Sequence, residues 1–481
     1  MQRIAVPASI RHIARRLAAM LTLALACALP LTAAPSPALA ETRTTDIVLG
    51  KTAEERDIDT GELPDISAAH ALIVSRDGTL YFERDADTPV KIASITKVMT
   101  AIVALEHSQL GDTVTVSHAA ATVGESSAYL KEGDSLSMEL ALRGLLIPSG
   151  NDAAIAIAET VGRTLDPASA DPVATFVSAM NAKAKELGCK DTLFTNPHGL
   201  DFGGWESNMH ATARDVATMY AYAMKNEAFR AIVNSQATDL TVTGADGAQR
   251  EIHQKMHNVI LGQEGNIGGK TGTTYDAGYC FVSGYTQETG GEVYVVVLGS
   301  SSDEQRFADT AALAHWYYGH WATVPLAHTN AKLGDQPIVG RVSAGDWSDR
   351  TVAATLEQPD QTAQVFSLAG AIEQKVDLDT LTGTISAGQK AGRLTYTQGG
   401  NEIVSAKLVT AEGQAAPNPL EWLMVQLDRL VRLAQGKPST AEAEVLNTVP
   451  DPLAYDGFTP AATDAAATDA STSPADSAAQ K

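Results

Sequence analysis

Cysteine is scarce in this sequence, with 3 in 481 residues. So few thiols exclude a disulfide-dense framework and any zinc or iron–sulfur site built from four thiolates. Basic residues are also outnumbered: 35 Lys and Arg face 57 Asp and Glu, which gives a net charge of −22. A chain this acidic lacks the basic surface that neutralises nucleic-acid phosphates, so nucleic acid is excluded as an expected partner. Hydrophobic residues make up 44% of the chain, enough to bury a sizeable core, so wholesale disorder is excluded as well.

Residues 1–40 have the pattern of a secretory signal peptide. Arginines precede an apolar run of 13 residues, 17–29, and small residues end the segment at Ala38-Leu39-Ala40. We predict cleavage after Ala40 and export to the cell envelope, on its periplasmic or extracellular face. The run is shorter than the roughly 20 residues that span a bilayer, although an uncleaved anchor remains the alternative.

Cleavage there changes the charge and leaves two thiols. It removes four arginines and no acidic residue, so the net charge goes from −22 to −26 (−22 − 4). Outside the cytoplasm, the remaining Cys189 and Cys280 could form a disulfide, or Cys280 could be a buried strand residue.

The first long region, 66–330, is predicted to be an α/β domain. A polar N-terminal lead, 41–65, precedes it, and we expect little structure there. The signal Asp77-Gly78 between apolar runs predicts an opening β-hairpin. Helical patterns cover 93–107, 138–146, 152–161, 172–187 and 211–224, and strand patterns return at 279–285 and 293–298. Strands at both ends with helices between them predict an antiparallel sheet that is flanked by helices and completed by distant pieces of chain.

The predicted secondary structure changes after residue 337. Short β runs with Gly-rich turns at 337–412 predict a separate small all-β domain. Residues 418–436 then predict an amphipathic helix, with Asn418 as N-cap, proline at the first helical position and Glu421 completing a capping box. This helix could lie in the membrane interface or dock against the β domain. The remaining residues, 437–481, predict a disordered tail.

A serine and a lysine open the first helical pattern. Ser94 and Lys97 are three residues apart, so they share one face of a helix and can be neighbours. A serine hydroxyl needs such help because it is a weak nucleophile, and a desolvated lysine near other positive charge can act as its base. One such match is nevertheless expected by chance in a chain of this length.

Two further motifs follow in order. Ser149-Gly150-Asn151 lies 55 residues after Ser94, in a loop between two helical patterns, and presents a hydroxyl and a carboxamide. Lys270-Thr271-Gly272-Thr273 lies 121 residues further on, just before the returning strands, where glycine allows a substrate backbone to approach closely. Each motif alone is an ordinary turn, but the ordered set is far more specific.

With these three motifs, the sequence resembles the penicillin-recognising serine enzymes, and most closely the low-molecular-mass D-alanyl-D-alanine carboxypeptidases. The resemblance covers roughly residues 67–436, including Asn196-Pro197-His198-Gly199-Leu200-Asp201. It implies a β-lactamase/transpeptidase-like catalytic domain, a small β domain and a terminal helix. It also implies peptidoglycan stem peptides ending in D-Ala-D-Ala as substrates, β-lactams as inhibitors, and no metal or cofactor.

The resemblance also assigns roles. Ser94 is acylated by the penultimate D-Ala, Lys97 is the general base, Ser149 relays a proton, and Asn151 holds Lys97 and the substrate amide. The implied substrate-binding residues are Lys270, Thr271, Gly272, Thr273 and Arg306. Backbone N–H groups of Ser94 and Thr273 would form the oxyanion hole. Some relatives carry histidine where this chain has Thr273, which puts substrate preference and the rate of deacylation in question.

Several rival functions use the same residues. A class A β-lactamase needs a glutamate for deacylation, and no E-x-x-L-N element lies between Asn151 and Lys270. A D,D-endopeptidase differs in groove shape rather than in motif, so it stays open. A penicillin-binding scaffold with little catalysis disagrees with the intact motifs. His253 and His257 have the i, i+4 spacing of a zinc site but lack H-E-x-x-H, so we interpret them as one solvated helical face.

Overall fold

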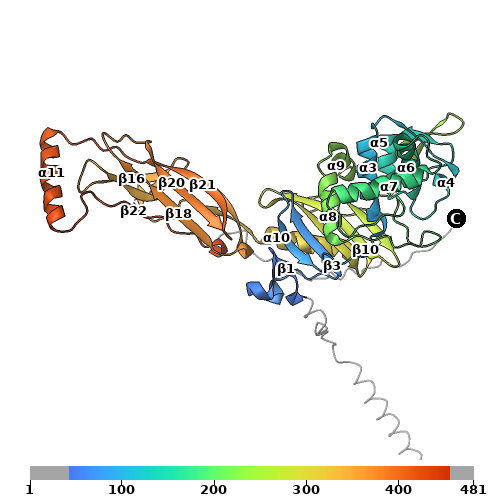
Figure 1. The fold of residues 1–481 in the computed structure, drawn as a ribbon, viewed down its shortest axis with the longest axis horizontal. Coiled ribbons are helices and arrows are strands. Elements are labelled where there is room, and N and C mark those ends of the chain that lie inside the picture. The colour runs from blue at the N-terminus through green and yellow to red at the C-terminus, as the bar shows by residue number, and fades with distance from the viewer. Residues whose placement is uncertain (1–42, 455–481) are drawn as a thin grey trace, which may run out of the picture.

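The computed structural model describes residues 43–454, so the predicted signal peptide and residues 455–481 of the predicted tail lie outside the described part of the chain. The expectation of disorder is wrong for the start of that tail, because residues 444–445 pair with the β region and Asn447 is buried there. The described chain is elongated, with a mixed α/β region at one end and a β region at the other (Figure 1).

A seven-stranded sheet forms the centre of the α/β region, in the order β2-β1-β4-β3-β11-β10-β9. Its strands are β1 (Ile47–Val48), β2 (Lys51–Thr52), β3 (His70–Ser75), β4 (Leu80–Arg84), β9 (Asn266–Thr274), β10 (Gly278–Gln287) and β11 (Gly291–Ser300). All of its pairings are antiparallel, and β3 from the start of the domain pairs with β11 from its end. The predicted sheet assembled from distant pieces is therefore confirmed.

Alternating side chains of these strands serve two separate cores. Leu72 and Val296 face the helical core, whereas Ile73 and Val295 face the core covered by α10. This period of two is the geometry of a strand buried on both sides. Helix α10 (Asp303–Gly319) covers one face. The helices of the other face include α3 (Lys97–His107), α4 (His118–Ala121), α5 (Met138–Leu146), α6 (Asn151–Leu165), α7 (Pro172–Glu186), α8 (Ala213–Ala223) and α9 (Glu227–Val233).

A four-stranded sheet lies at the edge of the helical layer. It contains β5 (Thr113–Thr115), β6 (Ser135–Ser137), β7 (Asp239–Thr243) and β8 (Gln249–His253). His253 ends β8 and His257 follows in a loop, so our interpretation of the two as one helical face is wrong.

The expectation of little structure over 41–65 is also wrong for most of that segment. Besides β1 and β2, it forms the short helices η1 (Glu54–Arg56) and η2 (Thr60–Glu62). Asp46 is buried and accepts two hydrogen bonds from Arg84 of β4, at 2.9 and 2.6 Å. Composition alone cannot show that one carboxylate of a polar segment pairs with a buried arginine of the sheet.

The second region is predominantly β. Its main sheet has the order β18-β20-β21-β16-β15-β19, with β22 on β15. The strands are β15 (Gly340–Ala344), β16 (Thr351–Leu356), β18 (Ile372–Leu378), β19 (Thr380–Leu381), β20 (Lys390–Gln398), β21 (Asn401–Thr410) and β22 (Glu444–Val445). Two small ribbons pair β12 (Trp321–Pro325) with β17 (Thr362–Phe366), and β13 (Lys332–Leu333) with β14 (Gln336–Pro337). The short helices η4 (Ser367–Ala369) and η5 (Pro452–Ala454) complete this region.

An aromatic cluster joins the two regions. Phe366 of β17 packs against Tyr81 of β4 at a ring-centroid distance of 4.9 Å and against Trp321 at 5.5 Å. Tyr317 of α10 contacts both Tyr81 and Phe366. Helix α10 leads to β12 through one residue, His320, so the connection between the regions is short and packed.

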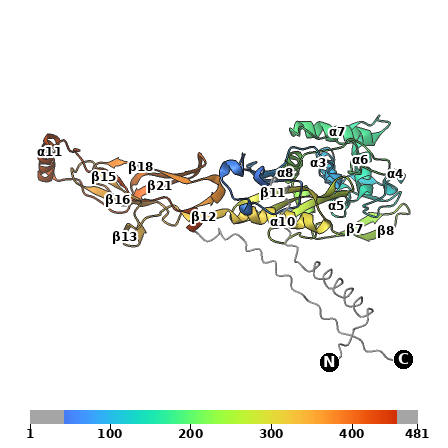
Figure 2. The same cartoon turned by 90° about the horizontal axis from the view of Figure 1, so that it is seen from below.

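Helix α11 (Pro419–Ala434) lies at the end of the β region that is farthest from the α/β region (Figures 1 and 2). The predicted capping box is present, with Asn418 and Glu421 bonding each other's backbone. The helix contacts the β region through a mixed face, which carries both apolar and charged side chains. On this face Val425 is buried and Arg429 donates to Gly345 O at 2.6 Å. Its apolar side chains instead face solvent, at Leu420, Trp422, Leu423, Met424, Leu427, Leu430, Val431 and Leu433.

Candidate active site

Ser94 lies on η3 (Ala93–Thr96), a single turn that leads directly into α3, of which Lys97 is the first residue. The turn is held tightly from two sides. A Cβ on Gly272 of β9 would lie 2.5 Å from Ile92 O and 3.2 Å from Ser94 N, and a Cβ on Gly199 would lie 2.0 Å from Ala93 O. Only glycine permits these approaches, which place β9 and the 196–201 loop directly against the serine.

Lys97 is completely buried among oxygen atoms. Its Nζ lies 2.7 Å from Ser94 Oγ, 2.7 Å from Asn151 Oδ1 and 2.7 Å from His198 O. Burial lowers the pKa of Lys97 to about 7, and the charge of Asp152 partly opposes this shift. A substantial fraction of Lys97 is therefore uncharged near neutral pH.

Ser149 and Asn151 stand at the start of α6. Ser149 adopts φ 62, a strained conformation for a residue with a side chain, in the short connection between α5 and α6. Asn151 donates from Nδ2 to Gly124 O at 3.0 Å, which turns its Oδ1 towards Lys97. Asp152 accepts from the backbone N–H groups of Ala128 and Leu130, so the same helix start also fixes the 124–130 loop.

The Lys270 side chain reaches Ser149 from β9. Its Nζ donates to Ser149 Oγ at 2.8 Å and to Thr271 O at 2.6 Å, and it is buried. Burial is the main cause that lowers its pKa well below the usual value, followed by the positive charges of Lys97 and Arg306. The hydroxyl of Ser149 thus contacts Lys270 directly, and the described contacts place Lys97 on Ser94 rather than on Ser149.

Arg306 completes the cluster from the first turn of α10. Its Nη1 donates to Thr273 Oγ1 at 2.7 Å and to Gly272 O at 3.2 Å. Its Nη2 forms an ion pair with Asp303. Thr273 therefore bonds Arg306 through its hydroxyl.

The structure brings together the predicted catalytic and substrate-binding residues, from η3, α3, the α5–α6 connection, α6, β9 and α10. Sequence reasoning assigned no role to two residues that shape the site, His198 and Asp152. His198 accepts a hydrogen bond from Lys97 through its backbone carbonyl. The negative charge of Asp152 acts on Lys97, and its carboxylate holds the 124–130 loop. The quoted Asn196–Asp201 run contained His198, but a backbone contact leaves no signature in the residue type.

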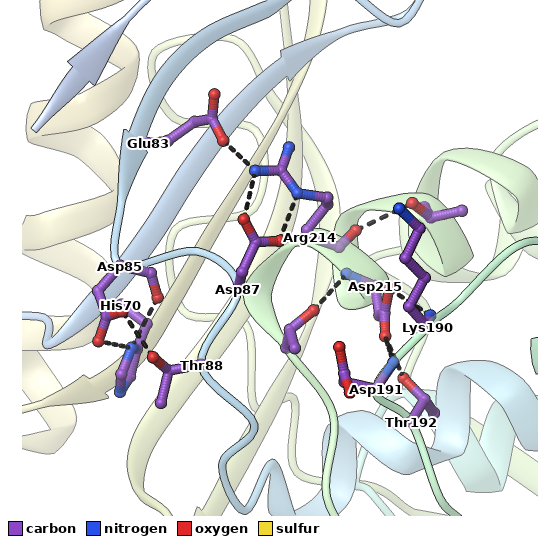
Figure 3. Close-up of polar contacts among 12 residues, drawn as sticks. His70, Glu83, Asp85, Asp87, Thr88, Lys190, Asp191, Thr192, Arg214 and Asp215 are labelled. Atoms are coloured by element: carbon purple, nitrogen blue, oxygen red, sulfur yellow. Dashed lines mark hydrogen bonds and ion pairs between the residues drawn. The ribbon is translucent and has the colours of Figure 1, made fainter. Parts of the chain in front are cut away.

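The chain that leads to Ser94 is anchored by a polar network shown in Figure 3. Arg214 of α8 donates to both carboxylate oxygens of Asp87, at 2.6 and 2.9 Å, and also bonds Glu83 of β4. Asp215 accepts from the backbone of Asp191 and the hydroxyl of Thr192. The Arg214 bonds tie the 85–91 loop, which leads to the η3 turn, to α8 and the sheet, and the Asp215 bonds tie residues 191–192 to the same helix.

Comparison with known proteins identifies this arrangement. The D-alanyl-D-alanine carboxypeptidase family, peptidase S11, matches residues 57–302. The chain belongs to this family. Among curated members, Escherichia coli DacC is 30% identical over 375 residues, covering 73% of this chain and 86% of DacC. The D-alanyl-D-alanine carboxypeptidase of Streptomyces sp. strain K15 is 33% identical over 248 residues, covering 50% of this chain and 82% of that protein.

A solved structure agrees in the α/β region. A variant of the Streptomyces K15 DD-transpeptidase superposes with a TM-score of 0.50 at 31% identity, covering 53% of this chain and 99% of that one. The expected penicillin-binding-protein fold and the serine-hydrolase class of the D-alanyl-D-alanine carboxypeptidase family are thus confirmed for this chain.

Two remaining expectations concern thiols and metals. Cys189 and Cys280 are free thiols, and burial raises their pKa values to about 12 and about 11. Among residues 43–454, no group of three or more His, Cys, Asp or Glu side chains is placed to hold a metal ion.

Proposed function

We propose that this protein removes the terminal D-Ala from peptidoglycan stem peptides ending in D-Ala-D-Ala, through an acyl-enzyme on Ser94. The observation that carries the proposal is the 2.7 Å contact between Ser94 Oγ and the Nζ of a lysine with a pKa of about 7. An amine with this pKa is matched to general-base catalysis at neutral pH.

The neighbours of Lys97 favour the base form. Uncharged Lys97 has two N–H groups and one lone pair. The carbonyl oxygens of Asn151 and His198 can only accept, so they take the two N–H groups and leave the lone pair for the Ser94 proton. Ser94 Oγ then attacks the carbonyl of the penultimate D-Ala, and the oxyanion forms against the backbone N–H groups of Ser94 and Thr273.

Collapse of the tetrahedral intermediate requires a proton at the leaving nitrogen. Ser149 is assigned this relay: its hydroxyl gives its hydrogen to the leaving nitrogen and receives in return the proton that Lys97 took from Ser94, while Lys270 donates to the Ser149 oxygen. The second Nδ2 hydrogen of Asn151 is assigned to the substrate amide. Water then attacks the acyl-Ser94 ester, with Lys97 again as the base. A β-lactam forms the same ester and is hydrolysed slowly.

The terminal carboxylate of the substrate is assigned to the positive end of the site. Lys270 and Arg306 supply charge there, and the Thr271 hydroxyl supplies a hydrogen bond. Gly272 keeps the strand close to the serine turn, as its contacts with Ile92 O and Ser94 N require.

We further propose that the protein is exported and works at the outer face of the membrane. Residues 1–40 support export, and the apolar face of α11 supports a position in the membrane interface. None of the helices within 43–454 is both long and apolar enough to cross a bilayer.

The test uses the chain from residue 41 and its Ser94→Ala variant. Each is incubated with a peptide ending in D-Ala-D-Ala, and with penicillin, while mass spectrometry follows free D-Ala and any protein adduct. We expect D-Ala release and a lasting adduct on Ser94 in the wild type only. Rapid penicillin hydrolysis without D-Ala release would favour a β-lactamase, an adduct without turnover a scaffold, and cleavage restricted to cross-linked peptides an endopeptidase.

A further inference from the structure

Arg306 pairs with Asp303 in the described chain. The Arg306 side chain is 7% exposed, yet it is assigned to a ligand that arrives from solvent. A guanidinium has five N–H hydrogens in a fixed plane, so their partners can be counted one by one.

Most of these hydrogens are unavailable to a substrate. Both hydrogens of Nη1 are used, by Gly272 O and Thr273 Oγ1. Nε is buried and has no hydrogen-bond partner in the described chain. The nitrogen that remains is Nη2. It has two hydrogens, and Asp303 is its ion-pair partner among the described residues. A carboxylate that reaches Arg306 therefore meets Asp303 at the same nitrogen.

Asp303 can leave that position at small cost. Its side chain is 57% exposed, so its carboxylate can rotate into water. It is also the first residue of α10, where the helix N-terminus favours a negative charge whether or not Arg306 is bonded. Two carboxylates at one guanidinium nitrogen repel each other, so the weaker-held one is displaced.

We propose that Asp303 is an internal counter-ion that occupies Arg306 in the empty site and gives way to the terminal carboxylate of the substrate. This rests on the proposed function, because it assumes that the substrate carboxylate reaches Arg306. Asp303 is then a specificity-determining residue that acts through Arg306: it neutralises a cation held near buried Lys97 and Lys270, and it yields only to another carboxylate.

The Asp303 pair should therefore slow acylation by some ligands and not by others. Every ligand with a free carboxylate must first break the Asp303 pair, whereas a ligand with an esterified carboxyl group does not compete for Arg306. Removing the charge of Asp303 should speed acylation by the first kind of ligand and leave the second unchanged. If Asp303 instead only orients Arg306, its removal should slow acylation by the carboxylate ligand.

The test compares Asp303→Asn with wild type and with a matched control, Glu304→Gln. Glu304 is the next residue on the same helix turn and accepts from Ser302 and from its own backbone N–H. Its charge acts on Arg306 without a described ion pair, so Glu304→Gln controls for the loss of a nearby negative charge. For each protein, intact mass follows acylation of Ser94 by a penicillin and by its methyl ester. The Arg306→Gln background, with and without Asp303→Asn, isolates the part of any effect that passes through Arg306. Thermal unfolding of each variant checks that α10 is intact.

We expect Asp303→Asn to raise the acylation rate constant for the penicillin by about fivefold, the scale of a partly exposed ion pair, and to leave the ester within experimental error. Glu304→Gln should change neither rate, and the gain should vanish in the Arg306→Gln background. Three results would overturn the inference while the proposed function stands. They are a lower acylation rate constant with the penicillin, an equal change in the rate constants for both ligands, and a higher rate constant that persists in the Arg306→Gln background. Failure of the wild type to acylate at Ser94 overturns the proposed function, and the inference falls with it.

Discussion

The active site and helix α11 depart from ordinary protein composition in opposite ways. The site buries the side chains of Lys97, Lys270 and Arg306, each held by hydrogen bonds, although lysine and arginine are rarely buried to this extent. Helix α11 exposes a continuous apolar face, with Leu430 63% and Leu433 75% accessible. The site buries polar side chains in the interior, and α11 exposes apolar side chains to solvent.

Each departure has a cost that folding alone does not explain. Burying a lysine disfavours its charged form, and an apolar face in water forgoes about 1.5–3 kcal/mol per large side chain. Positions that disagree with the rest of the structure in this way are expected at functional sites. The comparison therefore separates two functions along one chain: chemistry at one end and, we propose, surface attachment at the other.

The largest expected effect is the loss of the buried base. Lys97→Met keeps the length of the side chain but removes the nitrogen that faces Ser94. We expect the second-order rate constant for acylation by penicillin to fall by about 10²- to 10⁴-fold, the usual contribution of a general base. Lys185→Met, on the exposed part of α7, serves as the control and should leave the rate unchanged. A Lys97→Met protein that acylates at the wild-type rate would show that the buried lysine is not the base.

The second prediction concerns the aromatic cluster that joins the α/β region to the β region. Phe366→Ala removes the ring that packs against Tyr81, Tyr317 and Trp321. The cavity should lower the free energy of unfolding by about 3–5 kcal/mol, measured by urea denaturation. Leu333→Ala, at an exposed position on β13, is the control and should change stability by less than about 0.5 kcal/mol. If Phe366→Ala is as mild as the control, the two regions are stable independently of their contact.

The third prediction tests the exposed face of α11. Leu423→Gln, Leu427→Gln and Leu430→Gln together remove three apolar side chains without changing the charge. We expect affinity for phospholipid vesicles, measured by sedimentation, to fall by more than about 100-fold. Cleavage of a soluble D-Ala-D-Ala peptide should be unchanged, because α11 lies at the far end of the molecule (Figure 2). Vesicle binding that survives the triple substitution would assign the apolar face to another partner.

The two regions also differ in what their sequences could predict. Ser94, Ser149 and Lys270 belong to local motifs whose order specifies a known site, so local signals carried the prediction. The amphipathic pattern of α11 was equally clear, but a pattern cannot say which side of a helix faces the protein. Val425 and Arg429 on its mixed face make the contacts with the β region, and that choice depends on the partner surface.

Long-range polar contacts could not be predicted from the sequence for the same reason. The pairing of Asp46 with Arg84 orders a segment that looked unstructured by composition. The carbonyl of His198 on Lys97, and the contact of Ser149 with Lys270 rather than Lys97, are set by tertiary packing. Residue type and spacing describe which groups are available, but not which of several neighbours each one bonds.

The pH dependence of the site is a smaller effect than the three above, and it tests the comparison most directly. Because burial lowers the pKa of Lys97 to about 7, its neutral form is lost as pH falls through that value. Acylation should therefore rise with pH and level off above about 8, with roughly a tenfold difference between pH 6 and pH 8. The rate constant for penicillin should be measured at constant ionic strength, since salt also screens the other cations. An exposed lysine would place the same midpoint near 10.4. A midpoint there would mean that Lys97 is solvated in the working enzyme, and that the contrast between a desolvated site and an exposed apolar helix does not hold in solution.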